Sequence, residues 1–341
     1  MSAHTLFQNL APDRLAEALA AFGEEQVPPG TRLIAEFDTT DFVLLLEAGE
    51  VNVSVGGARV ATLEPGAVLG EIGLFTQAVR TATVTTTGPA VVRRLTRAAF
   101  DALRDAGNPV ASRVERRTLA QLQSRLDQPI ASLQAVALGA PVLRVPLLPE
   151  PAPGTVAPLS STALGAVLGT ATTFSALNHR HLRRMVPGAT LRVFGRDDII
   201  TDPDDQPTLH VLVEGAVHAF APLPASTRHQ ERVRVAHVGH GQIFGLSRRL
   251  GSDPLAYVAQ DACSVLSFDG SLATELMEGD SAHASSLRHA AIASLFARLT
   301  SANDLLKDAS RLLSTAAPAP HRDSLARDEP VQDVVFDPWF G

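Results

Sequence analysis

Apolar and polar positions follow two different spacings along the first 127 residues. Over residues 6–22 the apolar side chains recur every three to five positions, which predicts an amphipathic helix with its start near Pro12. From Val27 to Leu95 the apolar positions come in short alternating runs, separated by Pro-Gly and Gly-Gly turn signals. Many short strands with closely spaced turns are typical of a jelly roll or a similar β-roll. Helical spacing returns over residues 97–126.

The same pattern of turns and apolar runs returns from Phe174 onward. The recurring pairs are Pro29-Gly30 with Pro187-Gly188, Gly49-Glu50-Val51 with Gly215-Ala216-Val217, Gly66 with Gly241, and Gly70 with Gly245. Since turns and strand cores recur together, the second half is expected to be another domain of the same fold.

The segment between the two patterns has a different composition. Seven prolines fall between residues 128 and 172, among Ala, Leu, Val and Gly. A stretch this rich in proline predicts a linker, partly extended and lying along a domain surface, because it is too apolar for a freely solvated tether.

A helix is predicted from about Ser281 to Leu313, after the second roll. Its apolar positions step by three and four at Ile292, Leu295, Leu299, Ala302, Leu306, Ala309 and Leu313. This spacing fits a coiled-coil seam, so residues 292–313 are a candidate homodimer interface. The other interpretation is a helix packed on its own β-roll. The tail from Ala316 is rich in Pro and Asp and carries Trp339 and Phe340 near its end, which suggests docking on a partner or in a groove of the chain.

These patterns predict a mainly β protein with flanking helices, in which two tandem β-rolls are joined by a helical linker and followed by a C-terminal helix. The expected boundaries are 1–127 for the first roll, 128–173 for the linker, 174–279 for the second roll, 280–314 for the C-terminal helix and 315–341 for the tail.

Composition narrows the class of protein. With 341 residues, 45% of them hydrophobic, the chain is long enough for two cores, and its net charge of −7 argues against nucleic acid as an obligatory partner. Cys263 is the single cysteine, so no internal disulfide can form, and a reducing cytoplasm is the expected compartment. The N-terminus lacks a signal-peptide pattern, and the most apolar linker stretch is a poor membrane span.

The residue types that suggest chemistry gather between Val68 and Val84, in the stretch V-L-G-E-I-G-L-F-T-Q-A-V-R-T-A-T-V. Glu71 can only accept hydrogen bonds, which suits the hydroxyl groups of a sugar. Arg80 offers a planar fork of donors that suits two oxygens of a phosphate. Backbone N–H groups of a short helical turn can add donors to the same anion.

This sequence pattern resembles the phosphate-binding cassette of the cyclic-nucleotide-binding domain, which is shared by the catabolite activator family and the cyclic-nucleotide-dependent kinases. Against the family pattern, Leu69 replaces an aromatic residue and Val79 replaces a proline. The resemblance implies that cAMP or cGMP binds to Gly70, Glu71, Ile72, Leu74, Arg80, Thr81 and Ala82. Thr81 permits either nucleotide. In the family the residue covering the purine usually comes from the next helix, where the candidates are Arg113, Arg116, Arg117 and Leu119.

The second half carries apolar residues where the first has its ligand residues. A constant offset of 175 places Leu246, Leu255 and Ala256 at the positions of Glu71, Arg80 and Thr81. A phosphate buried there would lose charge-assisted hydrogen bonds of roughly 1.5–3 kcal/mol. The second pocket is therefore expected to be empty or adapted to something else, with Arg248 and Arg249 as the available substitutes.

Other chemistry has little support in the sequence. The pairs His179 with His181 and His237 with His240 have no carboxylate cluster beside them, so no metal site is predicted. No nucleophile elbow, Walker loop or dinucleotide fingerprint is present, and no enzyme is predicted.

The resulting hypothesis is a regulatory or sensor protein that binds a cyclic mononucleotide and signals through helix rearrangement to an unidentified protein partner. Two alternatives stay open. One is a structural or assembly protein that uses the rolls for contacts without a ligand. The other is a transcription regulator of the catabolite activator type, against which the acidic pI of about 5.9 and the missing recognition helix both argue.

Overall fold

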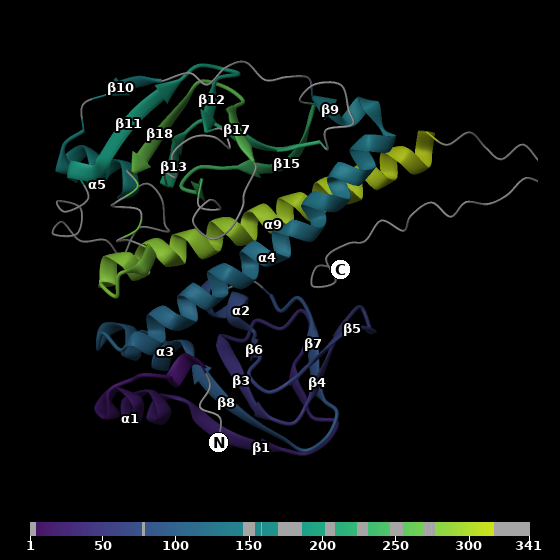
Figure 1. Cartoon of the computed structure of the whole chain (residues 1–341), viewed down its shortest axis with the longest axis vertical. Coiled ribbons are helices and arrows are strands. Elements are labelled where there is room, and N and C mark those ends of the chain that lie inside the picture. Colours follow the sequence, from purple (N-terminus) through teal and green to yellow (C-terminus); the bar gives the residue numbers. More distant parts are fainter. Residues whose placement is uncertain are drawn as a thin grey trace, which may run out of the picture.

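Two β-rolls lie on opposite sides of a pair of long helices in the computed structural model (Figure 1). This arrangement confirms the predicted fold class. The structure describes residues 5–76, 79–145, 154–157, 159–169, 186–201, 209–223, 231–245, 255–268, 270, 274 and 277–316.

The first roll consists of two four-stranded antiparallel sheets, with strand orders β1-β8-β3-β6 and β2-β7-β4-β5. The strands are β1 (Gly23–Val27), β2 (Arg32–Ile34), β3 (Phe42–Ala48), β4 (Val51–Val55), β5 (Ala58–Leu63), β6 (Val68–Leu69), β7 (Thr83–Thr86) and β8 (Ala90–Thr96). In β4 the valines are buried and the residues between them are half-buried, which is the period-two burial expected of a strand with one face on a core.

Helices close the open side of the first roll. They are η1 (Thr5–Phe7), α1 (Pro12–Ala21), α2 (Glu71–Thr76), α3 (Arg97–Asp105) and α4 (Pro109–Gly139). The predicted start of α1 at Pro12 is confirmed. The Thr96 hydroxyl accepts a hydrogen bond from the Ala99 amide and caps α3, and the Asn108 side chain caps α4 in the same way through Val110.

Helix α4 is longer than predicted. The sequence suggested a helix ending near Leu126 and a linker from residue 128, but α4 continues through Pro129 to Gly139. A proline inside a helix removes a backbone hydrogen bond. Here Leu126, Leu133 and Ala137 are buried on either side of it, and this packing outweighs the loss.

Part of the predicted linker also belongs to the second roll. Strand β9 (Arg144–Val145) pairs with β15, and β10 (Thr155–Ala157) pairs with β11. The described part of this segment also contains η2 (Pro141–Leu143) and α5 (Ser161–Gly169). The prediction of a linker over residues 128–173 is therefore wrong here, because β9 and β10 extend the sheet edges of the second roll and α5 buries Leu164 and Leu168 in the apolar core.

The second roll repeats the first and adds one strand to each sheet. Its strand orders are β10-β11-β18-β13-β16 and β12-β17-β14-β15-β9. The remaining elements are η4 (Val186–Gly188), β11 (Ala189–Phe194), β12 (Ile199–Thr201), β13 (Leu209–Glu214), β14 (Val217–Pro222), β15 (Arg232–Val238), β16 (Ile243–Phe244), β17 (Ala256–Ala259) and β18 (Cys263–Phe268). Gly49 and Gly215 occupy the same turn in the two rolls, with φ of 84° and 90°.

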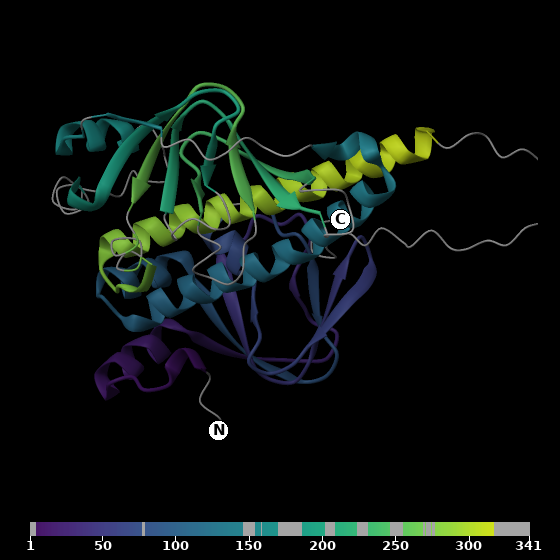
Figure 2. The same cartoon turned by 45° about the horizontal axis from the view of Figure 1, so that its top comes forward.

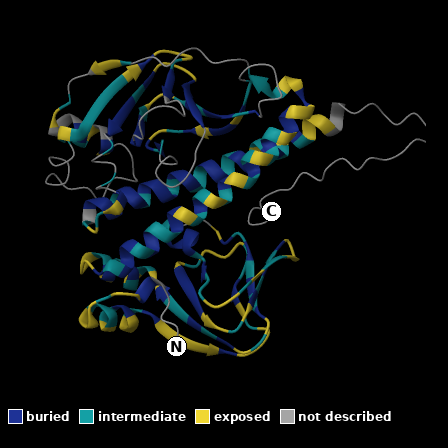
Figure 3. Cartoon of the chain, in the orientation of Figure 1, coloured by how far each residue is buried: buried dark blue, intermediate teal, exposed yellow. Residues whose placement is uncertain are grey.

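The predicted C-terminal helix is confirmed as α9 (Ala282–Ala316), which lies beside α4 with both helices ending on the same side (Figures 1 and 2). Most of its length is buried (Figure 3). The buried seam positions are Ile292, Leu295, Leu299, Ala302, Leu306 and Ala309. They pack against α4 and the second roll. The prediction of a dimer seam over residues 292–313 is therefore wrong at these positions, and the alternative of a helix packed on its own roll holds.

Candidate functional site

The cassette begins with a sharp turn from β6 into α2 at Gly70. This glycine has φ of 76°, in the left-handed region that residues with a Cβ rarely adopt. A Cβ at Gly70 would collide with the Arg80 side chain, and one at Gly73 would lie 2.7 Å from Arg80 Nη1. Both glycines therefore leave space for the Arg80 side chain, which passes directly beneath α2.

Protein oxygens surround the guanidinium of Arg80. Its Nε donates to Thr40 Oγ1 at 2.8 Å, Nη2 donates to the Phe42 carbonyl at 2.6 Å, and Nη1 donates to the Gly70 carbonyl. The residue is only 3% exposed. Burial lowers the pKa of Arg80, while the charges of Glu71, Asp41 and Asp38 act in the opposite direction. Because an arginine pKa starts so high, the side chain stays cationic at neutral pH.

Glu71, the first residue of α2, is also held by the protein. It is 2% exposed, and its Oε1 accepts a hydrogen bond from Arg125 Nη2 of α4 at 3.1 Å. A carboxylate this deeply buried needs a partner to balance its charge, and Arg125 supplies one. The structure thus couples the cassette to α4 through an ion pair.

Glu71 and Arg80 both line one cavity of about 260 Å³ in the first roll. Six of the seven predicted ligand residues line it: Gly70, Glu71, Ile72, Arg80, Thr81 and Ala82. The seventh, Leu74, points elsewhere and is fully buried in the core with Phe100 and Leu103. Its volume lies just below the range of roughly 300–1,000 Å³ that is usual for small-molecule sites.

Helix α4 forms the remaining polar wall of the cavity. Of the four residues considered for covering a purine, only Arg117 lines it, and its Nη2 donates to the Gly66 carbonyl at 3.1 Å. Leu119 is buried in the apolar core. Arg113 donates to the carbonyls of Leu6 and Gln8, and Arg116 donates to the Glu278 carbonyl and to Asp280.

Gln121 and Arg125 also line the cavity, and sequence reasoning missed both. Together with Arg117 they stand four residues apart along α4, which places all three on one face of the helix. That spacing is the signal that could have identified them. Within the described part of the chain, Gln121 Oε1 is buried without a hydrogen-bond partner.

The wall chemistry suits binding of an anion with hydroxyl groups. The cavity presents three guanidinium groups, one carboxylate and one side-chain amide.

Among the described residues, no three His, Cys, Asp or Glu side chains are grouped closely enough to hold a metal ion. None of the described helices combines the length and the apolar character that a bilayer crossing requires.

The equivalent region of the second roll shows that the offset of 175 holds only up to Gly245. Pairing of β4 with β7 sets Val51 opposite Thr86, and pairing of β14 with β17 sets Val217 opposite Ala259. Since Val51 matches Val217, Thr86 matches Ala259, and beyond the cassette the matching positions of the two halves lie 173 residues apart. Leu255 matches Ala82 rather than Arg80, so the assignment of Leu255 and Ala256 to the positions of Arg80 and Thr81 is wrong. The second cassette is two residues shorter.

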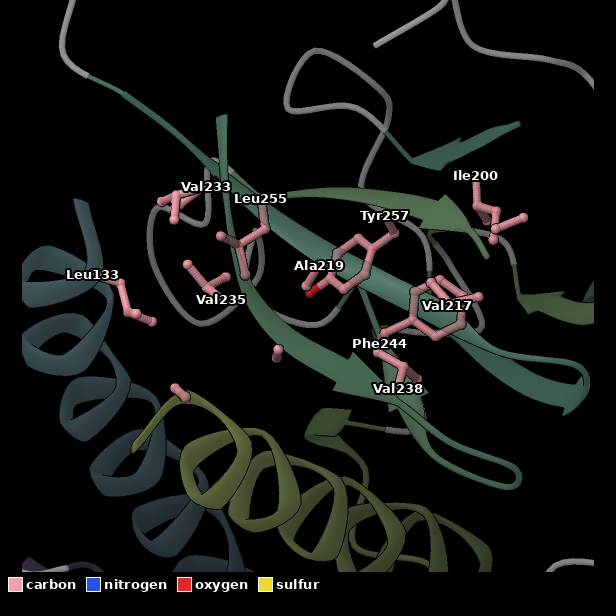
Figure 4. Packing of buried hydrophobic residues seen from close by; sticks show 14 of the residues in the cluster. Leu133, Ile200, Val217, Ala219, Val233, Val235, Val238, Phe244, Leu255 and Tyr257 are labelled. Carbon is pink, nitrogen blue, oxygen red and sulfur yellow. The ribbon is translucent and has the colours of Figure 1, made fainter. Parts of the chain in front are cut away.

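Large side chains fill the interior of the second roll at this place. Phe244, Leu255 and Tyr257 are all at most 3% exposed and pack together above α9 (Figure 4).

The remaining residues considered for chemistry lie elsewhere. Leu246, Arg248 and Arg249 of the second cassette lie outside the described residues, as do His179 and His181. His240 Nδ1 lies 2.6 Å from the Val213 carbonyl, and His237 lies across from His218 in the β14–β15 pair.

Among known proteins, residues 24–106 match the family described as "Cyclic nucleotide-binding domain". The cAMP-dependent protein kinase regulatory subunit of Mucor circinelloides f. lusitanicus is 32% identical over 97 residues, which is 28% of this chain and 23% of that protein. The corresponding subunit of Yarrowia lipolytica is 32% identical over 100 residues, or 29% and 27% of the two chains. Acetyltransferase Pat of Mycolicibacterium smegmatis is 33% identical over 107 residues, or 30% and 32%.

The chain thus spans about a quarter of the length of the curated kinase regulatory subunits that it matches. Among solved structures, the regulatory domain of Toxoplasma gondii PKA with cAMP aligns over 83% of this chain and 89% of its own, with 18% identity and a TM-score of 0.30. The regulatory subunit of a cAMP-independent protein kinase A from Trypanosoma brucei aligns over 81% of both chains, with 16% identity and a TM-score of 0.28.

Proposed function

We propose that this protein is a regulatory sensor that binds cAMP or cGMP in the cavity of the first roll, where residues 24–106 match the cyclic nucleotide-binding domain family. One observation carries the proposal. The cavity of about 260 Å³ is lined by Glu71 and Arg80 of the cassette and, on its other side, by three polar side chains of α4. A ligand there touches the cassette and α4 at the same time.

Binding requires two exchanges of partner. The phosphate takes hydrogen bonds from Arg80, which now donates to the carbonyls of Gly70 and Phe42. The ribose hydroxyl donates to Glu71, which now accepts from Arg125. Charge-assisted hydrogen bonds to the ligand replace those given up within the protein.

The second exchange gives the sensor its output. When the ribose hydroxyl donates to Glu71, the ion pair between Glu71 and Arg125 is lost, and α4 changes its packing against the cassette. A ligand shifts such an equilibrium only by the difference in its affinity for the two states. The proposed output is a change at α4 that an unidentified protein partner reads, in the cytoplasm and without catalysis by this chain.

A ligand-free assembly protein is the second candidate. The observation in its favour is that Arg80 and Glu71 each already have hydrogen-bond partners within the chain. In that case the cassette contributes packing and ion pairs to the fold, and the rolls serve for protein contacts.

Calorimetric titration of the full chain with cAMP and with cGMP separates the two. The sensor is expected to release or absorb heat with at least one nucleotide. Glu71→Gln preserves the shape of the side chain and is expected to weaken binding at least tenfold, because it removes a charge-assisted hydrogen bond of about 1.5–3 kcal/mol. Arg80→Ala is expected to weaken it by a similar factor or more.

Arg104→Ala is the matched control for Arg80→Ala, since Arg104 lies in the same half of the chain but pairs with Asp101 and Asp105 on the surface of α3. It is expected to leave affinity unchanged. Circular dichroism of each variant checks that the fold is retained. The absence of heat with either nucleotide at millimolar concentration would contradict the sensor and favour the assembly protein.

A further inference from the structure

Helix α9, from the far end of the chain, touches the cassette helix of the first roll directly. The imidazole of His289 lies 5.0 Å from the Phe75 ring and 5.8 Å from the Phe100 ring, measured between ring centroids. Phe75 and Phe100 also pack edge to face, 5.3 Å apart. Phe75 belongs to α2, the same six-residue helix that carries Glu71. The second half of the chain therefore contributes a side chain to the support of the cassette.

A charged network lies on the other side of the His289 ring. Its Nε2 lies 2.9 Å from Oε1 of Glu115, a residue of α4 with no exposed surface, in a close contact that lacks hydrogen-bond geometry. Arg288 Nε donates to Glu115 Oε2 at 2.5 Å, and the Ser285 hydroxyl donates to Oε1. Burial alone would raise the pKa of Glu115, but His289, Arg288 and Ser285 together lower it. The carboxylate thus stays charged and holds α9 in one register on α4.

A second side chain of α2 faces the same way. Ile72 belongs to the apolar core that includes Ile292 and Leu295 of α9, and this core extends to Phe268 of the second roll. The short helix α2 thus presents Glu71 to the cavity and Phe75 to α9, while Ile72 lies between them, lining the cavity and packing in the core shared with α9. Because protein cores are close-packed, α2 cannot shift at the cavity without changing these contacts.

We propose that α9 sets the position of the cassette helix, and that His289 is the positioning residue through which the second half of the chain controls the affinity of the first roll for its ligand. The control of affinity rests on the proposed function, whereas the positioning of α2 does not. Coupling between two sites is reciprocal, so a ligand held by Glu71 must also alter the packing of α9 beneath the second roll. The filled second roll then has a role as the structure on which α9 is anchored.

The test uses the full chain and a readout that needs no ligand. Hydrogen exchange of a peptide covering α2 is compared between the native protein and His289→Ala. Loss of the ring is expected to speed exchange in α2 about tenfold or more. His289→Phe keeps a ring on Phe75 and is expected to restore most of the protection. Phe75→Leu removes the contact from the α2 side and serves where His289→Ala does not fold.

Asn303→Ala is the matched control, since Asn303 is a buried polar residue of α9 that donates to the Leu299 carbonyl, more than three turns from His289. It is expected to leave exchange in α2 unchanged. Titration with cAMP and cGMP then measures the effect on affinity, expected to be at least fivefold for His289→Ala and absent for the control.

The outcomes separate the two proposals. Faster exchange in α2, together with altered affinity, supports both. Faster exchange in a protein that binds neither nucleotide supports the positioning role and removes the proposed function. Unchanged exchange in both His289→Ala and Phe75→Leu overturns the positioning role, whether or not the native protein binds a nucleotide.

Discussion

The strand order of the first roll recurs in the second, yet the first roll encloses a cavity, whereas in the described part of the second roll larger side chains occupy the matching positions. Strand pairing matches Leu69 with Phe244, since each lies on the short strand opposite β3 or β13. It matches Val84 with Tyr257 through the pairing with β4 and β14. At these positions the second roll carries the larger side chain, and its two rings lie 4.9 Å apart. A few interior side chains, rather than the fold, decide whether a roll can hold a ligand.

A polar difference accompanies the difference in size. Leu44 of the first roll matches His210 of the second, which is 3% exposed and stacks on Phe244. Arg298 of α9 lies 5.6 Å from the centroid of the Tyr257 ring. The described interior of the second roll thus buries an imidazole where the first roll has a leucine, and each roll has a buried guanidinium beside an aromatic ring, from Arg80 in the first and from Arg298 in the second. Three variants test how far these differences account for the two interiors.

The largest effect is expected from hollowing the filled roll with Tyr257→Val, which installs the residue found at the matching place in the first roll. Truncating a buried aromatic ring costs transfer free energy and leaves a cavity. We expect the free energy of unfolding to fall by about 2–4 kcal/mol, measured by urea denaturation. A loss below about 1 kcal/mol would mean that the second roll collapses around the gap, and that its interior is less rigid than its burial indicates.

The converse change, Val84→Tyr, places the aromatic ring of the filled roll into the cavity. We expect nucleotide affinity to fall at least 100-fold, or about 2.7 kcal/mol, in calorimetric titration, because the ring occupies the volume a ligand needs. Thr85→Tyr is the control, since it lies one residue along the same strand and its side chain points to the opposite face. Retained affinity in Val84→Tyr would show that the ligand binds elsewhere.

The smallest effect concerns pH and the matched pair Leu44 and His210. Burial first, and then the charge of Arg192, lower the pKa of His210 to about 3. Above pH 6.5 the side chain is neutral in both the folded and the unfolded chain, so it adds no pH dependence to the free energy of unfolding. Below pH 6.5 only the unfolded chain takes up the proton, and the free energy of unfolding falls by about 1.36 kcal/mol per pH unit.

Between pH 7 and pH 5 the native protein is therefore expected to lose roughly 2 kcal/mol through this residue. His210→Leu, which copies the first roll, is expected to remove that part of the pH dependence. Urea unfolding of both proteins at the two pH values measures the difference. Equal pH dependence in the two proteins would show that His210 is protonated in the folded state.

Local signals allowed much of this architecture to be predicted from the sequence. Turn glycines such as Gly49 and Gly215 require a left-handed backbone, so they mark the same corner in both halves. The cassette is contiguous in sequence, and six of its seven predicted residues do line one cavity.

What escaped prediction depends on contacts between distant segments. Helix α4 passes Pro129 because two rolls bury its apolar side chains, and no local pattern records that packing. Arg125 is 54 residues from Glu71, so their ion pair could be found only once α4 was placed over the cassette. The seam of α9 has the spacing of a dimer helix, and only the structure shows that its partners lie within the same chain.

The place of α9 at the end of the described chain has a consequence for biosynthesis. Leu119, Leu122 and Leu126 of α4 share a core with α9 residues that leave the ribosome about 170 residues later. At ordinary rates of translation this delay is roughly 10–30 s. Throughout that interval the newly made N-terminal half exposes the apolar face of α4, so chaperones are expected to bind it until α9 has been synthesised.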